Sequence, residues 1–287
     1  MKRLAILSEL LKLRISVVST LSAVTGFAAA AHGFSWAMAH ACLGVFLFAC
    51  GASALNEVQE RKLDALMERT RNRPIPSGRI SAGGALAVAL AVSATGFFVL
   101  WRFSGPTPAL LGLAALGWYN GAYTYLKRVT AFAVVPGSII GAIPPAIGWT
   151  AAGGALLDPR LGALCFFFFI WQVPHFWLLL FRLGKDYEKA GFPTMTQVFS
   201  LEQLGRLTFI WMVATAASCL LIPIFGLSAS PWVGLLMAAS GAWLCVVAAR
   251  LLKAQQQLPS LRLAFRDINI FALLVMVLVT LDAVLPL

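Results

Sequence analysis

Long apolar runs follow one another along the chain, with shorter polar segments between them. A membrane-crossing helix needs about 20 apolar residues. This measure predicts nine spans, with ends good to a few residues: about 15–32, 35–55, 82–101, 107–126, 130–152, 161–181, 207–226, 231–249 and 268–285. Pro and Gly recur in the fifth and sixth runs, where neighbouring groups in a membrane protein can satisfy the freed backbone. The pattern predicts an all-α polytopic membrane protein, a nine-transmembrane-helix bundle that forms one domain over residues 1–287.

Composition supports this class. Of the 287 residues, 60% are hydrophobic and 11% are charged, whereas a soluble domain has roughly 25% charged residues. Disorder, a disulfide scaffold and an ordinary soluble enzyme are therefore excluded. The five cysteines lie inside apolar runs without a CxxC or a Cys/His pairing, so we expect buried thiols and no zinc site.

The net charge of +11 is distributed unevenly across the predicted membrane. With nine spans, about 20 of the 22 Lys and Arg fall on the side of the N-terminus, and the other side keeps only Arg102 and Arg160. Short basic loops stay in the cytoplasm. The N-terminus is thus predicted to be cytoplasmic and the C-terminus outside. The basic surplus is explained by the lipid bilayer and needs no nucleic acid.

The first long cytoplasmic connection, about 56–81, carries oxygen ligands in a helical register. Asn56, Glu60 and Asp64 stand at i, i+4 and i+8, so on a helix they share one stripe. An amide and two carboxylates can hold Mg²⁺, which completes its shell with water and phosphates. Alternatively, the stretch is a solvated amphipathic helix held by ion pairs. Five basic residues surround the stripe: Arg61, Lys62, Arg69, Arg71 and Arg73.

A second connection that is rich in charged residues, about 182–206, lies on the same side. It begins with a mixed cluster of charged and aromatic residues, Arg182, Lys185, Asp186, Tyr187 and Lys189. The basic pair Lys127–Arg128 ends the fourth run at the same side. Two acidic and basic clusters at one mouth of a helical bundle are what a diphosphate clamp requires.

This arrangement suits a prenyl diphosphate, whose apolar tail lies between helices while its charged head stays at the mouth. Metal and arginines would neutralise the departing diphosphate, so that an allylic carbocation forms at the membrane boundary. No nucleophilic side chain is needed, and the sequence offers no Ser/His/Asp or Cys/His arrangement.

Five segments carry a family resemblance. They are NEVQERKLDALMERTRNRP (56–74), YTYLKRVT (123–130), GAIPPAIGW (141–149), WQVPHFW (171–177) and DYEKAGFP (186–193). The first has the pattern NxxxExxxDxxMxRTxxRP, and the set resembles the UbiA superfamily of intramembrane prenyltransferases. Within it, the set is most similar to the heme o synthase, or protoheme IX farnesyltransferase, branch. The DYxxAG form of the last segment separates this branch from quinone-forming relatives, whose second motif is more acidic.

The resemblance implies transfer of the farnesyl group of farnesyl diphosphate to a vinyl group of heme b, which is a substrate and not a cofactor. Water then completes heme o, and diphosphate is released. By position, the catalytic set that holds Mg²⁺ would be Asn56, Glu60, Asp64 and Asp186. The diphosphate would be bound by Arg69, Arg73, Lys127, Arg128, Arg182 and Lys185.

The same resemblance implies an enzyme of the bacterial inner membrane with its active site on the cytoplasmic side. Heme a synthase or the assembly of a terminal oxidase would use the product downstream. His175 in the PHFW segment is a candidate for heme binding, because an ionisable residue within a span is a functional candidate by default. A structural, hydrogen-bonded histidine is the alternative of near-equal weight. Tyr187 is the second heme-binding candidate.

Two features depart from the family pattern. Glu60 stands where most relatives have Asp, which lengthens the reach of the ligand by one methylene. Residues 131–142 (AFAVVPGSIIGA) replace a commoner Asn- and Gly-rich version. A prenyltransferase for aromatic quinone precursors remains an alternative, as does a transporter, which would place more of its charges at mid-membrane. Asp282, near the predicted outer end, has no partner evident from the sequence.

Overall fold

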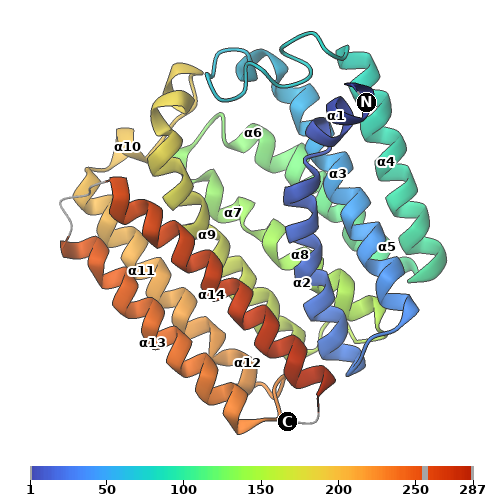
Figure 1. The fold of residues 1–287 in the computed structure, drawn as a ribbon, viewed down its shortest axis with the longest axis vertical. Coiled ribbons are helices and arrows are strands. Elements are labelled where there is room, and N and C mark those ends of the chain that lie inside the picture. The colour runs from blue at the N-terminus through green and yellow to red at the C-terminus, as the bar shows by residue number, and fades with distance from the viewer. Residues whose placement is uncertain (1, 254–257, 286–287) are drawn as a thin grey trace.

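The computed structural model describes residues 2–253 and 258–285, and in these ranges every regular element is a helix (Figure 1). The expected all-α class is confirmed for this part of the chain. The elements are α1 (Lys2–Leu10), α2 (Leu13–Ala31), α3 (Trp36–Asp64), α4 (Ala82–Phe103), α5 (Pro106–Leu116), the π-helical η1 (Gly117–Tyr123), α6 (Thr124–Leu126), the 3₁₀ turn η2 (Ala131–Ala133), α7 (Val134–Gly137), α8 (Ile139–Ala151), α9 (Pro159–Lys189), α10 (Met195–Val198), α11 (Leu201–Cys219), α12 (Leu221–Ile224), α13 (Pro231–Lys253) and α14 (Leu258–Val284).

Within the described residues, eight segments are long and apolar enough to cross a membrane. They are Leu13–Ala31, Trp36–Asp64, Ala82–Phe103, Ala131–Ala151, Pro159–Phe181, Leu201–Ile224, Pro231–Leu252 and Leu261–Val284. Each overlaps an expected span, and the expected span at 107–126 is not among them. Trp36 and Trp232 lie at the starts of their helices with 84% and 71% of their surface exposed, as expected for aromatic residues at a lipid interface. The chain is an integral membrane protein.

The long helices form a closed ring. α2 packs on α3 and α8, α8 on α9, α9 on α11, α11 on α13 and α13 on α14, which returns to α2. Where α2 crosses α8, the backbones touch. A Cβ added to Gly148 would lie 2.0 Å from the Ala23 carbonyl oxygen, and one added to Gly26 would lie 2.0 Å from that of Pro145. Only glycine permits this close approach, so α2 and α8 pack tightly against each other.

The charged segments gather at one end of the bundle, at the top of Figure 1. This charged end comprises residues 56–81, 124–130 and 182–200, and α1 begins there. α14 ends at the opposite end, near α12. The prediction that residues 56–81 and 182–206 are connections was wrong in part, because α3 continues to Asp64 and α9 to Lys189. α3 has 29 residues and is about 43 Å long, so its last turns extend beyond a hydrocarbon core of about 30 Å.

Asp282 does have partners, contrary to the sequence-based expectation. Its carboxylate accepts hydrogen bonds from the backbone N–H groups of Ala229 (3.0 Å) and Ser230 (3.3 Å), just before α13 begins. Free N–H groups at a helix start favour a nearby negative charge. Asp282 therefore fastens α14 to the start of α13 at the end opposite the charged one.

Candidate active site

The stripe predicted on α3 lies inside the protein. Asn56, Glu60 and Asp64 are 3%, 4% and 0% exposed. Their shared helix confirms the predicted register, and their burial excludes a solvated amphipathic helix. A buried carboxylate must be paired or hydrogen-bonded, because an isolated buried charge is very costly.

Two cations neutralise the two carboxylates. The Arg73 guanidinium donates to both carboxylate oxygens of Asp64 at 2.8 Å, and Lys127 Nζ lies 2.7 Å from Glu60 Oε2. Burial tends to lower the pKa of Arg73, but the Asp64 carboxylate outweighs it and raises that pKa overall. Burial also lowers the pKa of Lys127, and Glu60 opposes this shift. Both pairs are held away from water, so each loss of a partner would leave a costly charge.

The π-helical segment positions Lys127. Its Asn120 donates to the carbonyl of Ala52 (3.1 Å) and to Gln59 Oε1 (3.0 Å), and Gln59 donates back to the Asn120 carbonyl at 2.9 Å. One turn later, Thr124 accepts a hydrogen bond from Asn56 at 3.1 Å. π-bulges are rare overall, but those that occur are frequently found at functional sites. Here it fixes the end of the fourth run against α3.

The two motif regions meet through Asp186. Its two carboxylate oxygens accept hydrogen bonds from the backbone N–H groups of Glu68 (2.9 Å) and Arg69 (3.3 Å). Met67 is buried beside Ala190 and Phe192 in a small apolar cluster. The turn after α3 is thereby docked on the end of α9, and the predicted gathering of both motifs at one end is confirmed.

The other predicted basic residues are spread around this centre. Arg128 donates to the Gln59 carbonyl at 3.1 Å. Arg69 and Lys185 are exposed, and the side chain of Arg182 lies outside the described residues. Beside α3, a cavity of about 450 Å³ is lined by Gln59, Arg61, Lys62, Leu63, Arg128, Ala190, Gly191 and Phe192. Three cations therefore face one opening next to the buried pairs.

Sequence reasoning missed two residues of this region. Lys12, between α1 and α2, has a left-handed backbone (φ 46°), and its ammonium lies within electrostatic reach of Arg73, Glu57, Asp64 and Lys127. Burial and then Arg73 lower the pKa of Lys12 to about 8. Glu57 is fully buried; its Oε1 accepts from the Ile75 N–H at 3.3 Å. The only sequence signal was that both charges border an apolar run.

Two buried carboxylate oxygens at this site accept no hydrogen bond from the described part of the chain. Among the described residues, Glu60 Oε1 and Glu57 Oε2 are buried without a hydrogen-bond partner. In the same part of the chain, no three acidic, His or Cys side chains stand together as a metal site. Unsatisfied carboxylate oxygens fit a hard divalent cation. The other carboxylate oxygens that would bind it are occupied by Arg73, on Asp64, and by Lys127, on Glu60. The four-residue metal set stays a prediction.

The two heme-binding candidates differ in position. His175 is half-buried within α9, and its Nδ1 lies 2.8 Å from Asn269 Oδ1 on α14. Tyr187 lies at the charged end, with its ring 5.3 Å from that of Phe192. Burial raises the pKa of Tyr187, which therefore stays a neutral phenol.

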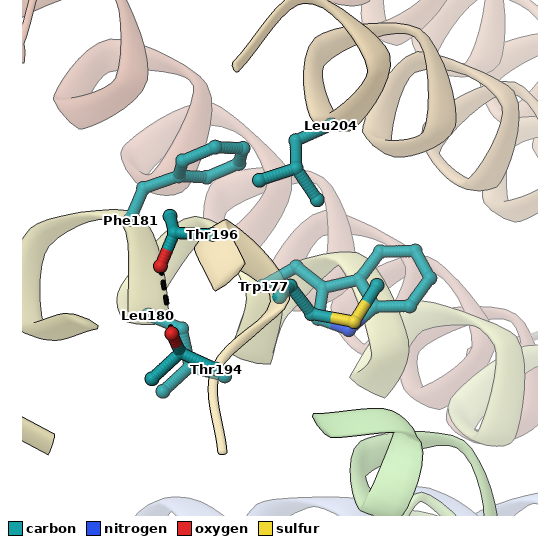
Figure 2. A pocket seen from close by; sticks show the side chains of 7 residues that line it. Trp177, Leu180, Phe181, Thr194, Thr196 and Leu204 are labelled. Atoms are coloured by element: carbon teal, nitrogen blue, oxygen red, sulfur yellow. Dashed lines mark hydrogen bonds between the residues drawn. The ribbon is translucent and has the colours of Figure 1, made fainter. Parts of the chain in front are cut away.

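A second cavity is too small for any substrate. Figure 2 shows Trp177, Leu180, Phe181 and Leu204 around it, with Thr194 and Thr196 joined by a hydrogen bond of 2.8 Å. Its volume of about 20 Å³ suits one water at most. Both threonine hydroxyls also lie within hydrogen-bond distance of Glu188 Oε1 (2.6 and 2.7 Å), so this region fastens the segment after α9 to α9 itself.

Known proteins resemble the chain over most of its length. It is 47% identical to the protoheme IX farnesyltransferase of Geobacter sulfurreducens, covering 77% of this chain and 82% of that protein. It is 35% identical to the protein of the same name from Oleidesulfovibrio alaskensis, covering 96% and 95%. The solved structure of a UbiA homolog from Archaeoglobus fulgidus, bound to GPP and Mg²⁺, shares the fold at a TM-score of 0.67 and 16% identity, with 96% and 98% covered.

The family itself is matched almost end to end, since residues 17–275 correspond to the UbiA prenyltransferase family. These residues include the stripe on α3, Lys127, His175 and Asp186. The chain belongs to the UbiA prenyltransferase family.

Proposed function

We propose that this chain transfers the farnesyl group of farnesyl diphosphate to a vinyl group of heme b and releases heme o and diphosphate. The observation that carries this assignment is the 35% identity to a protoheme IX farnesyltransferase over 96% of the chain. The buried carboxylates and cations of the charged end supply matching chemistry. The product would pass to a heme a synthase or to the assembly of a terminal oxidase.

We infer that the ion pairs at the charged end exchange partners when substrate binds. Arg73 and Lys127 neutralise Asp64 and Glu60 at 2.8 and 2.7 Å. A diphosphate offers these two cations a stronger anion, and their departure frees carboxylate oxygens beside the already unpartnered Glu60 Oε1. Asn56, Glu60, Asp64 and Asp186 would hold Mg²⁺, which supplies charge neutralisation to the leaving diphosphate.

The side chains then act on the substrate by charge and exclusion of water. Arg73, Lys127 and the cations around the larger cavity stabilise the negative charge that develops as the C–O bond to diphosphate breaks. The farnesyl chain, left as an allylic cation, is attacked by the π electrons of a heme vinyl group. Water adds to the resulting cation and loses a proton, which gives the hydroxyethylfarnesyl side chain.

Acceptor choice tests the proposed function against the quinone-type alternative. Purified protein is incubated with farnesyl diphosphate, Mg²⁺ and equal amounts of heme b and 4-hydroxybenzoate. We expect mass spectrometry to detect a farnesylated heme and no farnesylated benzoate. Prenylation of 4-hydroxybenzoate alone would refute the assignment.

We propose that residues Pro106–Leu126 form a ninth span, with the charged end in the cytoplasm of a bacterial inner membrane. α5, η1 and α6 follow one another without a gap. An odd number of spans accounts for α1 beginning at one end of the bundle and α14 ending at the other (Figure 1). A reporter inserted near Ser77 should behave as cytoplasmic and one fused after Leu287 as external. Both reporters on one side of the membrane would contradict the ninth span.

Lys12 is expected to contribute to diphosphate binding. Its ammonium has no ion pair within the described chain and lies near Arg73 and Lys127. Hydrogen bonds to charged groups contribute about 1.5–3 kcal/mol, so Lys12→Met should raise the KM for farnesyl diphosphate by about 10- to 100-fold. Arg14→Met, which removes an exposed charge two residues away, is the matched control. An unchanged KM in Lys12→Met would exclude this role.

A further inference from the structure

Asn269 on α14 determines which ring nitrogen of His175 on α9 carries the proton. The Asn269 amide nitrogen donates to the Phe265 carbonyl oxygen, one turn earlier in α14, at 2.5 Å. Its oxygen must therefore be the atom that faces His175 Nδ1, at 2.8 Å. Since an amide oxygen can only accept, the proton of this hydrogen bond belongs to Nδ1.

This hydrogen bond determines which ring nitrogen is free. A neutral imidazole carries one N–H, so with Nδ1 protonated the lone pair resides on Nε2. Among the described residues, Nε2 has no hydrogen-bond partner, and the ring makes no salt bridge that would favour its charged form. A neutral imidazole with a free Nε2 is the usual state of a metal-ligating histidine.

The ring is also held in orientation. Its centroid lies 4.8 Å from that of Trp171, 5.1 Å from Phe265 and 5.5 Å from Phe176. Trp171 is itself fixed, because its indole N–H donates to the Ile268 carbonyl at 3.1 Å. Aromatic rings from both α9 and α14 thus pack around the imidazole and hold its orientation.

We propose that Asn269 is a positioning residue that holds His175 as its Nδ1–H tautomer and so presents Nε2 as an axial ligand to the iron of the heme substrate. This inference rests on the proposed function, because it needs heme b as the acceptor. Groups that hydrogen-bond the second nitrogen of a ligating histidine typically affect metal affinity 10- to 100-fold. The contact also explains why an amide and not an apolar residue occupies this position within a membrane helix.

The test is a titration of the purified protein with ferric heme, followed by the Soret band, with iron-free protoporphyrin IX as a second probe. We expect wild type to bind heme with an imidazole-ligated spectrum and to bind the iron-free porphyrin more weakly. His175→Ala should lose that spectrum and regain it with added imidazole. Asn269→Leu should weaken heme binding by about 10-fold or more, whereas Asn269→Asp, which still accepts from Nδ1, should retain it.

Thr280→Val is the control for a purely structural role, because Thr280 joins α14 to α2 by a hydrogen bond of 3.4 Å far from His175. If all variants bind ferric heme with the same spectrum and affinity while heme o is still formed, the inference is wrong and the proposed function stands. If wild type neither binds nor farnesylates heme, both are wrong.

Discussion

Asp64→Asn is expected to lower farnesyl transfer at least about 100-fold, an effect of the size seen when charge stabilisation at a reacting centre is removed. Asp64 is fully buried and accepts two hydrogen bonds from Arg73. The amide keeps the shape but can neither neutralise Arg73 nor hold Mg²⁺. The measurement is the initial rate of heme o formation at saturating substrates, together with the amount of protein inserted in the membrane.

A matched surface pair provides the control. Asp158 and Arg160 also form an Asp–Arg pair, with Arg160 44% exposed, at the start of α9 and so at the end of this helix away from the charged end. Exposed pairs contribute about 0–1 kcal/mol, so Asp158→Asn should be nearly as active as wild type. Because Asp64→Asn strands a buried charge, the double variant Asp64→Asn/Arg73→Met should recover stability but not activity. Substantial activity in either Asp64 variant would remove Asp64 from the site.

Glu60 is expected to tolerate a change in length but not a loss of charge. Its Oε2 pairs with Lys127 at 2.7 Å and its Oε1 is buried without a partner, so the carboxylate has an unused ligand atom. Glu60→Asp should keep substantial activity, because the mouth can adjust by one methylene. Glu60→Gln should lose most of it, because Mg²⁺ sites are usually held by one or two carboxylates and this change removes one of them.

The dependence of the reaction rate on Mg²⁺ concentration distinguishes a role of Glu60 in metal binding from a role in packing. Heme o formation is measured at limiting and saturating Mg²⁺, and excess Mg²⁺ should partly rescue Glu60→Gln if its defect is metal affinity. Chelator should abolish turnover of wild type. Near-equal rates for wild type and Glu60→Gln at limiting Mg²⁺ would show that Glu60 is not a ligand.

Features that depend on local geometry could be predicted from the sequence. The stripe of Asn56, Glu60 and Asp64 follows from helical periodicity alone, and the apolar runs locate the long helices because membrane thickness sets their length. The fourth run illustrates the limit. Its length gave no sign of the π-helical segment, because that segment is stabilised by hydrogen bonds from Asn120 to α3.

Partners that are distant in the sequence could not be predicted. Lys127 meets Glu60 across 67 residues, and Asp186 meets the backbone of Arg69 across 117. Such contacts depend on how whole helices pack. Lys12 was missed because its position follows from a left-handed turn and from Leu10, which anchors α1 among buried residues of α3 and α4. Asn269 was missed because it lies beyond the motif segments, on a helix that the sequence marks only as hydrophobic.

The most direct test of the central claim is to follow both products of one reaction in water enriched in ¹⁸O. Purified protein, Mg²⁺, farnesyl diphosphate and heme b should yield heme o and diphosphate in equal amounts. Mass spectrometry should place one ¹⁸O atom in the new hydroxyl group, because water quenches the cation formed when the vinyl group attacks. Release of diphosphate together with free farnesol, while heme b is left unchanged, would contradict the account.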